Sequence, residues 1–341
     1  MSSHELELTA QALVAEGKGI LAADESNATI AKRFASVGVE STPEARAEWR
    51  ELLVTTPGAS DAISGVILYD ETFRQHTELG PRFPEAVEQA GMIPGVKVDT
   101  GAKPRAGEPR EKVTEGLDGL RDRLGAYREG GARFTKWRAV IAIGDGVPTR
   151  ACLAANAHAL ARFAALSQES GLVPVVEPDV LMEGDHPLER CLEVTEAMLA
   201  IVFDQLREQG VGLEGMLLKP NMVLPGSGYP EQAGVEEVAE ATLRCMLRCV
   251  PVAVPGIVFL SGGQDEQRAT AHLNAMNALV PQPWELSFSF ARALQGTALS
   301  TWRGERANRE AAQGAFLHRA RCASAARRGR YVEAMEKELV A

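Results

Sequence analysis

Short apolar segments alternate along the chain with longer segments whose apolar positions recur at helical spacing. Eight short segments have the pattern of buried strands: residues 19–24, 64–70, 94–99, 134–143, 173–180, 215–221, 256–262 and 284–290. Residues 149–170 and 188–210 are typical of the helices between them. Gly171 and Gly210 stand where the C-caps of these two helices are expected.

This alternation predicts a parallel sheet, because parallel strands need crossover connections. Eight such units predict an α/β fold, a (β/α)8 barrel in a single domain spanning residues 1–341, with extra N-terminal and C-terminal helices. An open doubly wound sheet is the alternative. It would need a glycine-rich turn after an early strand, and the segment GILAADES has none. Residues 306–341 have a helical pattern, and we expect their RRGR run (327–330) to be a solvated helix face.

The composition narrows the function classes. With 341 residues and 45% hydrophobic content, the chain can form a barrel-sized core. A net charge of −10 and a pI near 5.3 argue against nucleic-acid or anionic-membrane binding. The segment MSSHELELTA does not resemble a signal peptide, and no apolar run reaches membrane-spanning length. Five scattered cysteines without a C-x-x-C pair indicate reduced thiols in a cytoplasmic protein.

Polar residues gather where the predicted strands end. Asp24 ends the first strand, Ser261 the seventh, and Ser289 belongs to the eighth. Pairs two residues apart follow four other strands: Lys97 and Asp99, Lys136 and Arg138, Glu177 and Asp179, Lys219 and Asn221. That spacing puts both members on one face. Any one pair could be a buried ion pair, but four at the same ends predict an active site, since buried charges are costly unless paired or functional.

Lys219 ends an apolar strand and is followed at once by Pro220. Its ammonium either extends to water or loses its charge for chemistry. Burial and the neighbouring cation Lys136 would favour the neutral form, which is a nucleophile toward ketones. Dehydration to a Schiff base needs a proton donor, and Glu177 lies on the intervening strand.

Two segments are typical of phosphate sites. SGGQDEQ (261–267) places two glycines before the first turn of a helix, where backbone N–H groups can approach an anion, and Arg292 after the last strand adds donors. On the other side, residues 26–33 contain Ser26, Thr29, Lys32 and Arg33; their simpler interpretation is an N-capped surface helix. With Lys97 they would form a second anion site. Two anion sites flanking a lysine predict a doubly phosphorylated ketone as substrate.

Metal chemistry is the rival hypothesis. The six histidines have no familiar ligand spacing, and the chain lacks a Walker A motif and a nucleophile elbow. The acidic loop 177–187 could hold a cation, but we expect Glu183, Asp185 and His186 to cap the next helix. We therefore predict no metal and no cofactor.

In family order, the chain contains GKGILAADES, GVKVDTG, KWR, VEPDVLMEGDH, LLKPNM, FLSGGQ and SFARALQ, and it resembles the class I fructose-bisphosphate aldolases over nearly its whole length. The resemblance implies a barrel, a metal-independent Schiff-base mechanism and a homo-oligomer, a homotetramer. It also implies reversible cleavage of fructose 1,6-bisphosphate to dihydroxyacetone phosphate and glyceraldehyde 3-phosphate, in glycolysis and gluconeogenesis.

Carried over by position, the resemblance implies that Lys219 forms the Schiff base, Glu177 is its general acid/base, and Asp24 is the base at the C4 hydroxyl. Lys136 and Arg138 would position and polarise the substrate. The C1-phosphate side would consist of Ser261, Gly262, Gly263, Ser289 and Arg292, and the C6-phosphate side of Ser26, Thr29, Arg33 and Lys97.

The sequence departs from the family pattern at a few positions. Asp179 stands where many members have Glu, Thr29 where many have Ser, and Phe290-Ala291 where Tyr-Gly is common. The chain ends in Val340-Ala341, whereas animal members end in a tyrosine used in proton transfer. Val332, Met335 and Leu339 recur at helical spacing, so we expect a packed helix end, with C3 proton transfer by Glu177 or Asp179 through water.

Two alternatives remain at this stage. One is a barrel aldolase for sedoheptulose bisphosphate or fructose 1-phosphate. The other is a non-catalytic binding or scaffold protein that retains the fold; it would be expected to have lost Lys219, Glu177 or Asp24, and all three are present.

Overall fold

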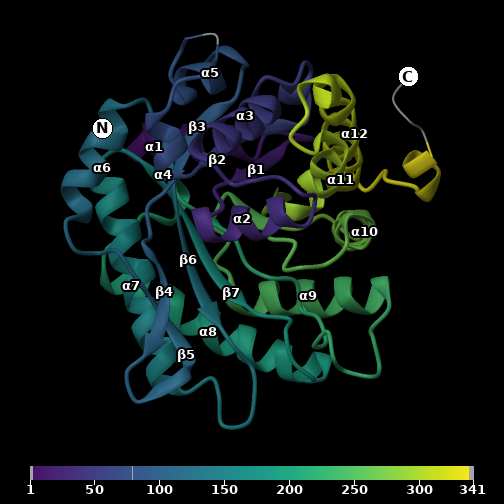
Figure 1. Cartoon of the computed structure of the whole chain (residues 1–341). Helices are drawn as coiled ribbons and strands as arrows, with labels where there is room; N and C mark the ends of the chain where they lie inside the picture. The colour runs from purple at the N-terminus through teal and green to yellow at the C-terminus, as the bar shows by residue number, and fades with distance from the viewer. Residues whose placement is uncertain (1–2, 79, 338–341) are drawn as a thin grey trace.

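The computed structural model describes residues 3–78 and 80–337 and contains a closed barrel of parallel strands (Figure 1). Around the barrel the order is β1-β10-β9-β8-β7-β6-β3-β2. The strands are β1 Gly19–Ala23, β2 Ile63–Leu68, β3 Ile93–Lys97, β6 Phe134–Ile141, β7 Val173–Val180, β8 Leu217–Leu218, β9 Gly256–Phe259 and β10 Glu285–Phe290. β1 pairs with both β2 and β10, which closes the barrel. The predicted (β/α)8 fold is confirmed, and each of the eight expected strands is present.

Helices form the outer layer around the barrel (Figure 1). They are α1 Ser3–Leu13, α2 Asn27–Ala35, α3 Pro43–Val54, α4 Asp70–Arg74, α5 Phe83–Gln89, α6 Leu120–Glu129, α7 Arg150–Glu169, α8 Leu188–Glu208, α9 Val235–Cys249, α10 Glu266–Ala278, α11 Arg292–Trp302 and α12 Arg309–Arg327. Short 3-10 helices occupy Ala59–Asp61, Leu213–Gly215, Arg306–Asn308 and Glu333–Lys337. Gly171 (φ 71°) and Gly210 (φ 68°) follow α7 and α8 in the left-handed conformation, as expected for C-caps. Within the described residues, the helices are too short or too polar to cross a bilayer.

The barrel interior is apolar at one end and charged at the other. Val175 and Leu217 pack inside with Leu6, Ala10 and Leu13 of α1, which covers the N-terminal ends of the strands. The next residues, Val176 and Leu218, belong to the separate core between barrel and helices. Glu177 and Lys219 come one position later and so return to the interior, because strand side chains alternate between faces. The apolar layer beneath therefore supports a charged layer at the C-terminal ends.

Glycine makes room for one bulky side chain in the apolar layer. A Cβ on Gly95 would lie 2.3 Å from the Phe134 ring, and one on Gly65 would lie 3.1 Å from it. Phe134 can therefore fill the barrel interior only because its two neighbours carry no side chain.

The structure contains an antiparallel hairpin that the hydrophobic pattern did not predict. β4 (Gly101–Arg105) pairs with β5 (Glu108–Glu115) between β3 and β6, and it projects beyond the barrel (Figure 1). Its strands are mostly exposed or half-buried, so they lack the apolar run that marks the barrel strands. Glu111 is an exception, since its buried carboxylate accepts hydrogen bonds from Arg105 and from Thr149, the N-cap of α7.

The basic run 327–330 is not a solvated helix face throughout, and that expectation is wrong for Arg327. This side chain is buried and donates to the carbonyl oxygens of Val14, Lys18 and Leu286. It also pairs with Glu285 at 2.8 Å. Since these carbonyls belong to the segment before β1 and to β10, Arg327 holds together the two strands that close the barrel. Arg328 and Arg330 are exposed, as expected.

The C-terminal segment is not one continuous helix. α12 ends at Arg327, Gly329 has φ 63°, and residues 333–337 form a 3-10 helix. Val332 is 56% exposed, so the expectation of a packed helix end is wrong at this position. Leu339 lies outside the described residues. The segment is held by polar contacts instead, because Glu336 accepts hydrogen bonds from Arg319 and Tyr331.

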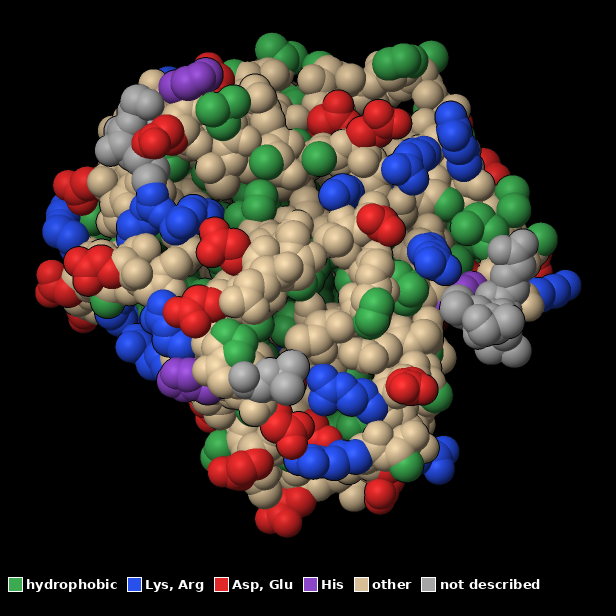
Figure 2. Space-filling model, turned by 90° about the horizontal axis from the view of Figure 1, so that it is seen from above, with side chains coloured by type: hydrophobic (Ala, Val, Ile, Leu, Met, Phe, Trp, Pro, Cys, Tyr) green, Lys and Arg blue, Asp and Glu red, His purple; other side chains and the backbone are tan. Residues whose placement is uncertain are grey.

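Side chains of both charges are interspersed over the face of the molecule seen in Figure 2. This face carries no broad patch of a single charge.

Candidate active site

A cavity of about 230 Å³ opens at the C-terminal ends of the barrel strands. Every residue to which we assigned a catalytic or substrate-binding role lines it: Asp24, Ser26, Thr29, Arg33, Lys97, Lys136, Arg138, Glu177, Asp179, Lys219, Ser261, Gly262, Gly263, Ser289 and Arg292. Lys32, Asp99 and Asn221, which the sequence pattern also placed at the strand ends or just after them, lie outside the cavity wall. These residues come from strands and loops distributed over the whole sequence. The barrel therefore brings together residues that are far apart in the sequence.

Lys136 is the centre of a buried charge network. Its ammonium lies 2.6 Å from Asp24 Oδ2 and 2.9 Å from Glu177 Oε2. Burial works against its charge, but the two carboxylates outweigh burial and raise the pKa of Lys136 far above that of an ordinary lysine. Lys136 therefore stays a cation at any working pH.

Lys219 lies in the same network, but the groups around it shift its pKa in the opposite direction. Among the described residues its one ion pair is with Glu177 Oε1, at 3.3 Å. Burial lowers the pKa of Lys219, and of its charged neighbours Glu177 opposes this shift while Lys136 reinforces it. Lys219 is therefore the lysine of this pair that more readily becomes a neutral amine.

The two carboxylates of the network stay ionised. Burial alone would raise the pKa of Asp24, but the attraction of Lys136 and Lys219 holds it well below its usual range. The pKa of Glu177 is lowered too, because Lys136, Lys219 and Arg138 together outweigh burial. Both groups begin as proton acceptors, and a proton taken up by Glu177 can be returned to a neighbouring atom.

Two further ion pairs flank this network. Arg138 Nε donates to Asp179 Oδ2 at 2.8 Å, and this contact raises the pKa of the guanidinium further. Burial raises the pKa of Asp179 in spite of that partner. Lys97 pairs with Asp99 at 3.3 Å, and Asp99 also accepts from the backbone N–H groups of Gly101 and Arg138. Each cation is thus held by a carboxylate on its own or the next strand.

Hydrogen-bond donors gather in the cavity wall where the loop after β9 meets the start of α11. Gly262 (φ 58°) and Gly263 (φ 97°) are in the left-handed region, which turns the loop after β9 without steric strain. A Cβ on Gly263 would lie 3.7 Å from Arg292 Nη2, so the loop and Arg292 face each other. Ser289 Oγ is buried and has no hydrogen-bond partner within the described chain. Such a set suits a multidentate anion.

Another part of the cavity wall is formed by the start of α2. Ser26 caps this helix by accepting from the N–H of Thr29, and the two hydroxyls lie 3.0 Å apart. Arg33, one turn further on, pairs with the buried Glu25. Both interpretations made from the sequence are thus compatible, since the N-capped helix is also the cavity wall.

A model of class-I fructose-bisphosphate aldolases matches residues 5–341. The chain belongs to this family. A probable class 1 fructose-bisphosphate aldolase of Xanthomonas campestris is 60% identical over 89% of the chain and 90% of that protein. The fructose-bisphosphate aldolase of Dictyostelium discoideum is 50% identical over 96% of the chain and 92% of that protein.

The solved structures contain the same fold. The fructose-bisphosphate aldolase of Plasmodium falciparum, in complex with TRAP and a small-molecule inhibitor, superposes with a TM-score of 0.95. It is 46% identical to this chain, and the match covers 97% of this chain and 96% of the other. The resemblance inferred from seven short motifs is therefore confirmed at the level of the family.

The structure corrects two local expectations around the cavity. The helix after the glycine loop, α10, is capped by the side chain of Asp265, which leaves its N-terminus unsuited to a phosphate. Gly263 instead faces Arg292 at the start of α11. The N-cap of α8 is Pro187 without a side-chain bond, so Glu183, Asp185 and His186 do not cap it.

Two acidic residues line the cavity without having been predicted. Glu25 and Glu183 contribute to its wall, Glu25 next to Asp24 and Glu183 in the loop after β7. Glu25 follows the strand-end aspartate directly and would have pointed to the opposite face in a continuing strand. No periodicity could have placed Glu183, because it lies in an irregular loop.

Proposed function

We propose that this chain catalyses the reversible cleavage of fructose 1,6-bisphosphate to dihydroxyacetone phosphate and glyceraldehyde 3-phosphate through a Schiff base on Lys219. The assignment of Lys219 rests on the difference in charge state between Lys219 and Lys136. Lys136 is held as a cation between two carboxylates, whereas burial and Lys136 favour the neutral form of Lys219.

Schiff-base formation then proceeds in two proton-balanced steps. The neutral amine of Lys219 attacks the C2 carbonyl carbon and gives a carbinolamine. Glu177, 3.3 Å from the amine, accepts the proton that the Lys219 ammonium gives up before attack, and returns it to the C2 hydroxyl, which leaves as water. The iminium that results is the electron sink for the next step.

Cleavage begins when Asp24 takes the proton of the C4 hydroxyl. The C3–C4 bond breaks, its electron pair moves into the iminium as an enamine, and C4 leaves as the aldehyde of glyceraldehyde 3-phosphate. The proton taken by Asp24 passes to Glu177 or to Asp179 and reaches C3 through water, which turns the enamine back into an iminium. Addition of water to the iminium then releases dihydroxyacetone phosphate and regenerates Lys219. Lys136 stabilises the developing alkoxide as a fixed cation, and Arg138, held by Asp179, orients the sugar hydroxyls.

Two groups of donors in the cavity wall support a doubly phosphorylated substrate. We assign the C1 phosphate to Ser261, Gly262, Gly263, Ser289 and Arg292, and the C6 phosphate to Ser26, Thr29, Arg33 and Lys97. Cationic side chains in both groups favour a bisphosphate over fructose 1-phosphate, which would leave one group without a phosphate.

The test is borohydride trapping with dihydroxyacetone phosphate, followed by peptide mapping. We expect one reduced adduct, on Lys219, and complete loss of turnover in Lys219→Arg, because a guanidinium stays protonated. The matched control is Lys112→Met, which removes an exposed lysine of β5 and should leave trapping intact. An adduct on Lys136 or Lys97 would overturn the assignment.

We further propose that this reaction needs no metal ion or cofactor, since the iminium on Lys219 takes the role of a Lewis acid. Activity should survive exhaustive EDTA treatment. Loss of activity on chelation, with recovery on adding a divalent cation, would contradict this mechanism.

We propose that the chain is a single domain. A continuous core cluster runs from Leu21 to Ala326 and supports this division. We also propose the cytoplasm as its location, supported by five cysteines that form no disulfide, which fits a reducing compartment.

We propose that the protein is a homo-oligomer, a homotetramer by resemblance to its family. An apolar patch formed by Leu247, Leu279 and Val280 is 45–76% exposed and lies next to Glu240 and Arg244 of α9. Charges of both signs beside one apolar patch allow two copies related by a two-fold axis to pair Glu240 with Arg244 across the interface.

A further inference from the structure

We propose that His318, Cys322 and Glu336 form a binding site for a divalent cation, with zinc as its best occupant, on the outside of the barrel. His318 and Cys322 belong to α12, and Glu336 belongs to the 3-10 helix that follows it. One potential ligand atom from each side chain lies within 4.8 Å of the other two. None of the three lines the catalytic cavity, so this site is separate from the proposed aldolase chemistry.

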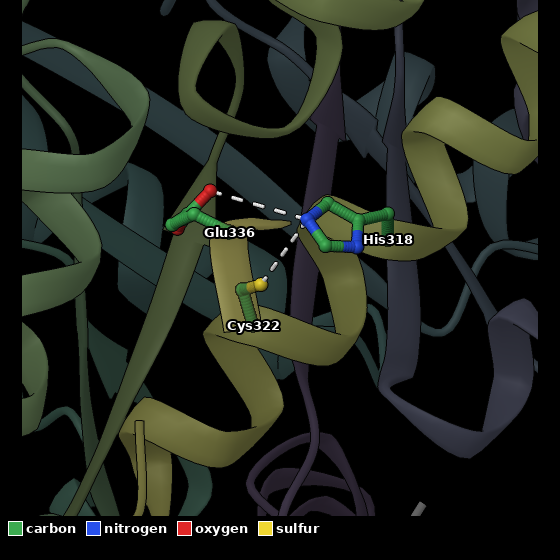
Figure 3. Close-up of side chains that lie close together, drawn as sticks. All are labelled: His318, Cys322 and Glu336. Carbon is green, nitrogen blue, oxygen red and sulfur yellow. Dashed lines mark hydrogen bonds and ion pairs between the residues drawn. The ribbon is translucent and has the colours of Figure 1, made fainter. Parts of the chain in front are cut away.

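The helix fixes two of the three ligands. His318 and Cys322 are four residues apart, and residues at that spacing share one face of an α-helix. In Figure 3 both side chains point into the same space, and Glu336 enters it from the neighbouring segment. A thiolate, an imidazole nitrogen and a carboxylate oxygen are the ligand types that zinc takes in proteins.

The two distances from His318 Nε2 to the other ligand atoms are close to those of a tetrahedral zinc site. Zinc bonds of about 2.3 Å to sulfur and about 2.0 Å to nitrogen and oxygen give ligand separations of about 3.3–3.6 Å. Cys322 Sγ lies 3.7 Å from His318 Nε2, and that nitrogen lies 3.9 Å from Glu336 Oε2. The third separation, between Cys322 Sγ and the Glu336 carboxylate, is up to 4.8 Å, so the carboxylate would move toward the sulfur to complete the site. Three protein ligands leave the fourth position to water.

The salt bridge between Arg319 and Glu336 is compatible with a bound cation. An ionised carboxylate has four lone-pair positions. Arg319 Nη1 donates to both oxygens of Glu336, and the Tyr331 hydroxyl donates to Oε1 at 2.7 Å. These three bonds leave one position, on Oε2, which is the oxygen nearest to His318.

Arg319 and Tyr331 also orient the carboxylate. Hydrogen bonds from outside the coordination sphere commonly hold metal-binding carboxylates in place. Arg319 is itself fixed, since its Nη2 donates to Glu266 O at 3.0 Å and to Thr270 Oγ1 at 2.7 Å. The carboxylate is therefore positioned before any ion arrives, which lowers the entropic cost of binding.

On binding, Cys322 would lose its thiol proton and become a thiolate. This thiolate and the Glu336 carboxylate would together balance the charge of the divalent cation. The His318 imidazole is neutral when it acts as a ligand. The ion would cross-link α12 to residues 333–337, so its physical effect is to fix the C-terminal segment on the barrel.

The full-length protein, stripped with a chelator and dialysed, is titrated with Co²⁺ as a spectroscopic probe for Zn²⁺. We expect one equivalent per chain, a thiolate-to-cobalt charge-transfer band in the near ultraviolet, and visible bands of a four-coordinate ion that Zn²⁺ then abolishes. Cys322→Ser should remove the charge-transfer band. His318→Ala should weaken binding more than about a hundredfold, which exceeds the loss expected for an outer partner.

Matched controls separate this site from other thiols and imidazoles. Cys249→Ser removes a partly exposed cysteine, and His158→Ala removes an exposed histidine. Both should leave the titration unchanged. Tyr331→Phe should keep the charge-transfer band and weaken binding about tenfold, as expected for the loss of an outer hydrogen bond to a ligand. The proposal is overturned by a wild-type titration without the band, or by a band that survives Cys322→Ser.

Discussion

Lys136 and Lys219 show how neighbours decide the charge of identical side chains. Both are buried in one network, and they share Glu177. Only Lys136 also contacts Asp24, and this second carboxylate separates the directions in which their pKa values move. The sequence could place both lysines at strand ends, but their distances to the carboxylates depend on the barrel geometry and could not be read from spacing.

The pH dependence of Schiff-base formation follows from this arrangement. The neutral fraction of Lys219 grows as pH rises through its lowered pKa. Lys136→Met removes a cation that lowers the pKa of Lys219, so the rise should move to higher pH. The measurement is the rate of borohydride trapping against pH with saturating dihydroxyacetone phosphate, beside Lys112→Met. If the pH profile of Lys136→Met keeps the wild-type midpoint and only its amplitude falls, Lys136 contributes to substrate binding and does not lower the pKa of Lys219.

Arg292 tests the assignment of the C1-phosphate end. Arg292→Ala should raise the KM for dihydroxyacetone phosphate in the condensation direction about tenfold to a hundredfold, because a charge-assisted hydrogen bond is worth about 1.5–3 kcal/mol. Arg321→Ala, an exposed arginine of α12, is the control. An unchanged KM for Arg292→Ala would mean that this side chain serves the fold alone.

At the scale of elements, hydrophobic periodicity predicted the strands and helices that bury apolar side chains. It missed the segments whose position depends on polar contacts. The eight barrel strands and helices α7 and α8 bury continuous or periodic apolar positions, and all were found. β4 and β5 bury little and were missed. The segment after α12 was assigned to helix packing, but Glu336 with Arg319 and Tyr331 determines its position.

Arg327 is the clearest case of a polar contact between elements. Arg327→Ala would leave the carbonyl oxygens of Val14, Lys18 and Leu286 without this donor. Lys18 O and Leu286 O each keep a second donor, Ser287 Oγ and Asn277 Nδ2, so the cost falls mainly on Val14 O. A buried acceptor left unsatisfied costs about 1–3 kcal/mol, and we expect a loss of that size. Urea unfolding measures it, with the exposed Arg330→Ala as the control, expected within about 0.5 kcal/mol of wild type. Equal unfolding midpoints for the two variants would contradict this role.

At the scale of the whole molecule, the apolar patch on α9 and the loop after α10 predicts assembly. Leu247→Asp and Val280→Asp each place a charge in the proposed interface and should reduce the mass measured by light scattering. Val332→Asp is a matched control, because Val332 and Leu247 are both 56% exposed. If the interface variants keep the wild-type mass, the contact between subunits lies elsewhere.

The pairing of β1 with β10, held by Arg327, has a consequence for the order of synthesis. The ribosome makes β1 among the first residues and its partner β10 only near the end, and Arg327 emerges later still. Until then the nascent sheet has two unpaired edges, which can pair with other chains. A product terminated before β10 would also lack Ser289 and Arg292. Truncated translation products of this chain should therefore aggregate and never act as partial enzymes, which makes protection during synthesis a requirement of the fold.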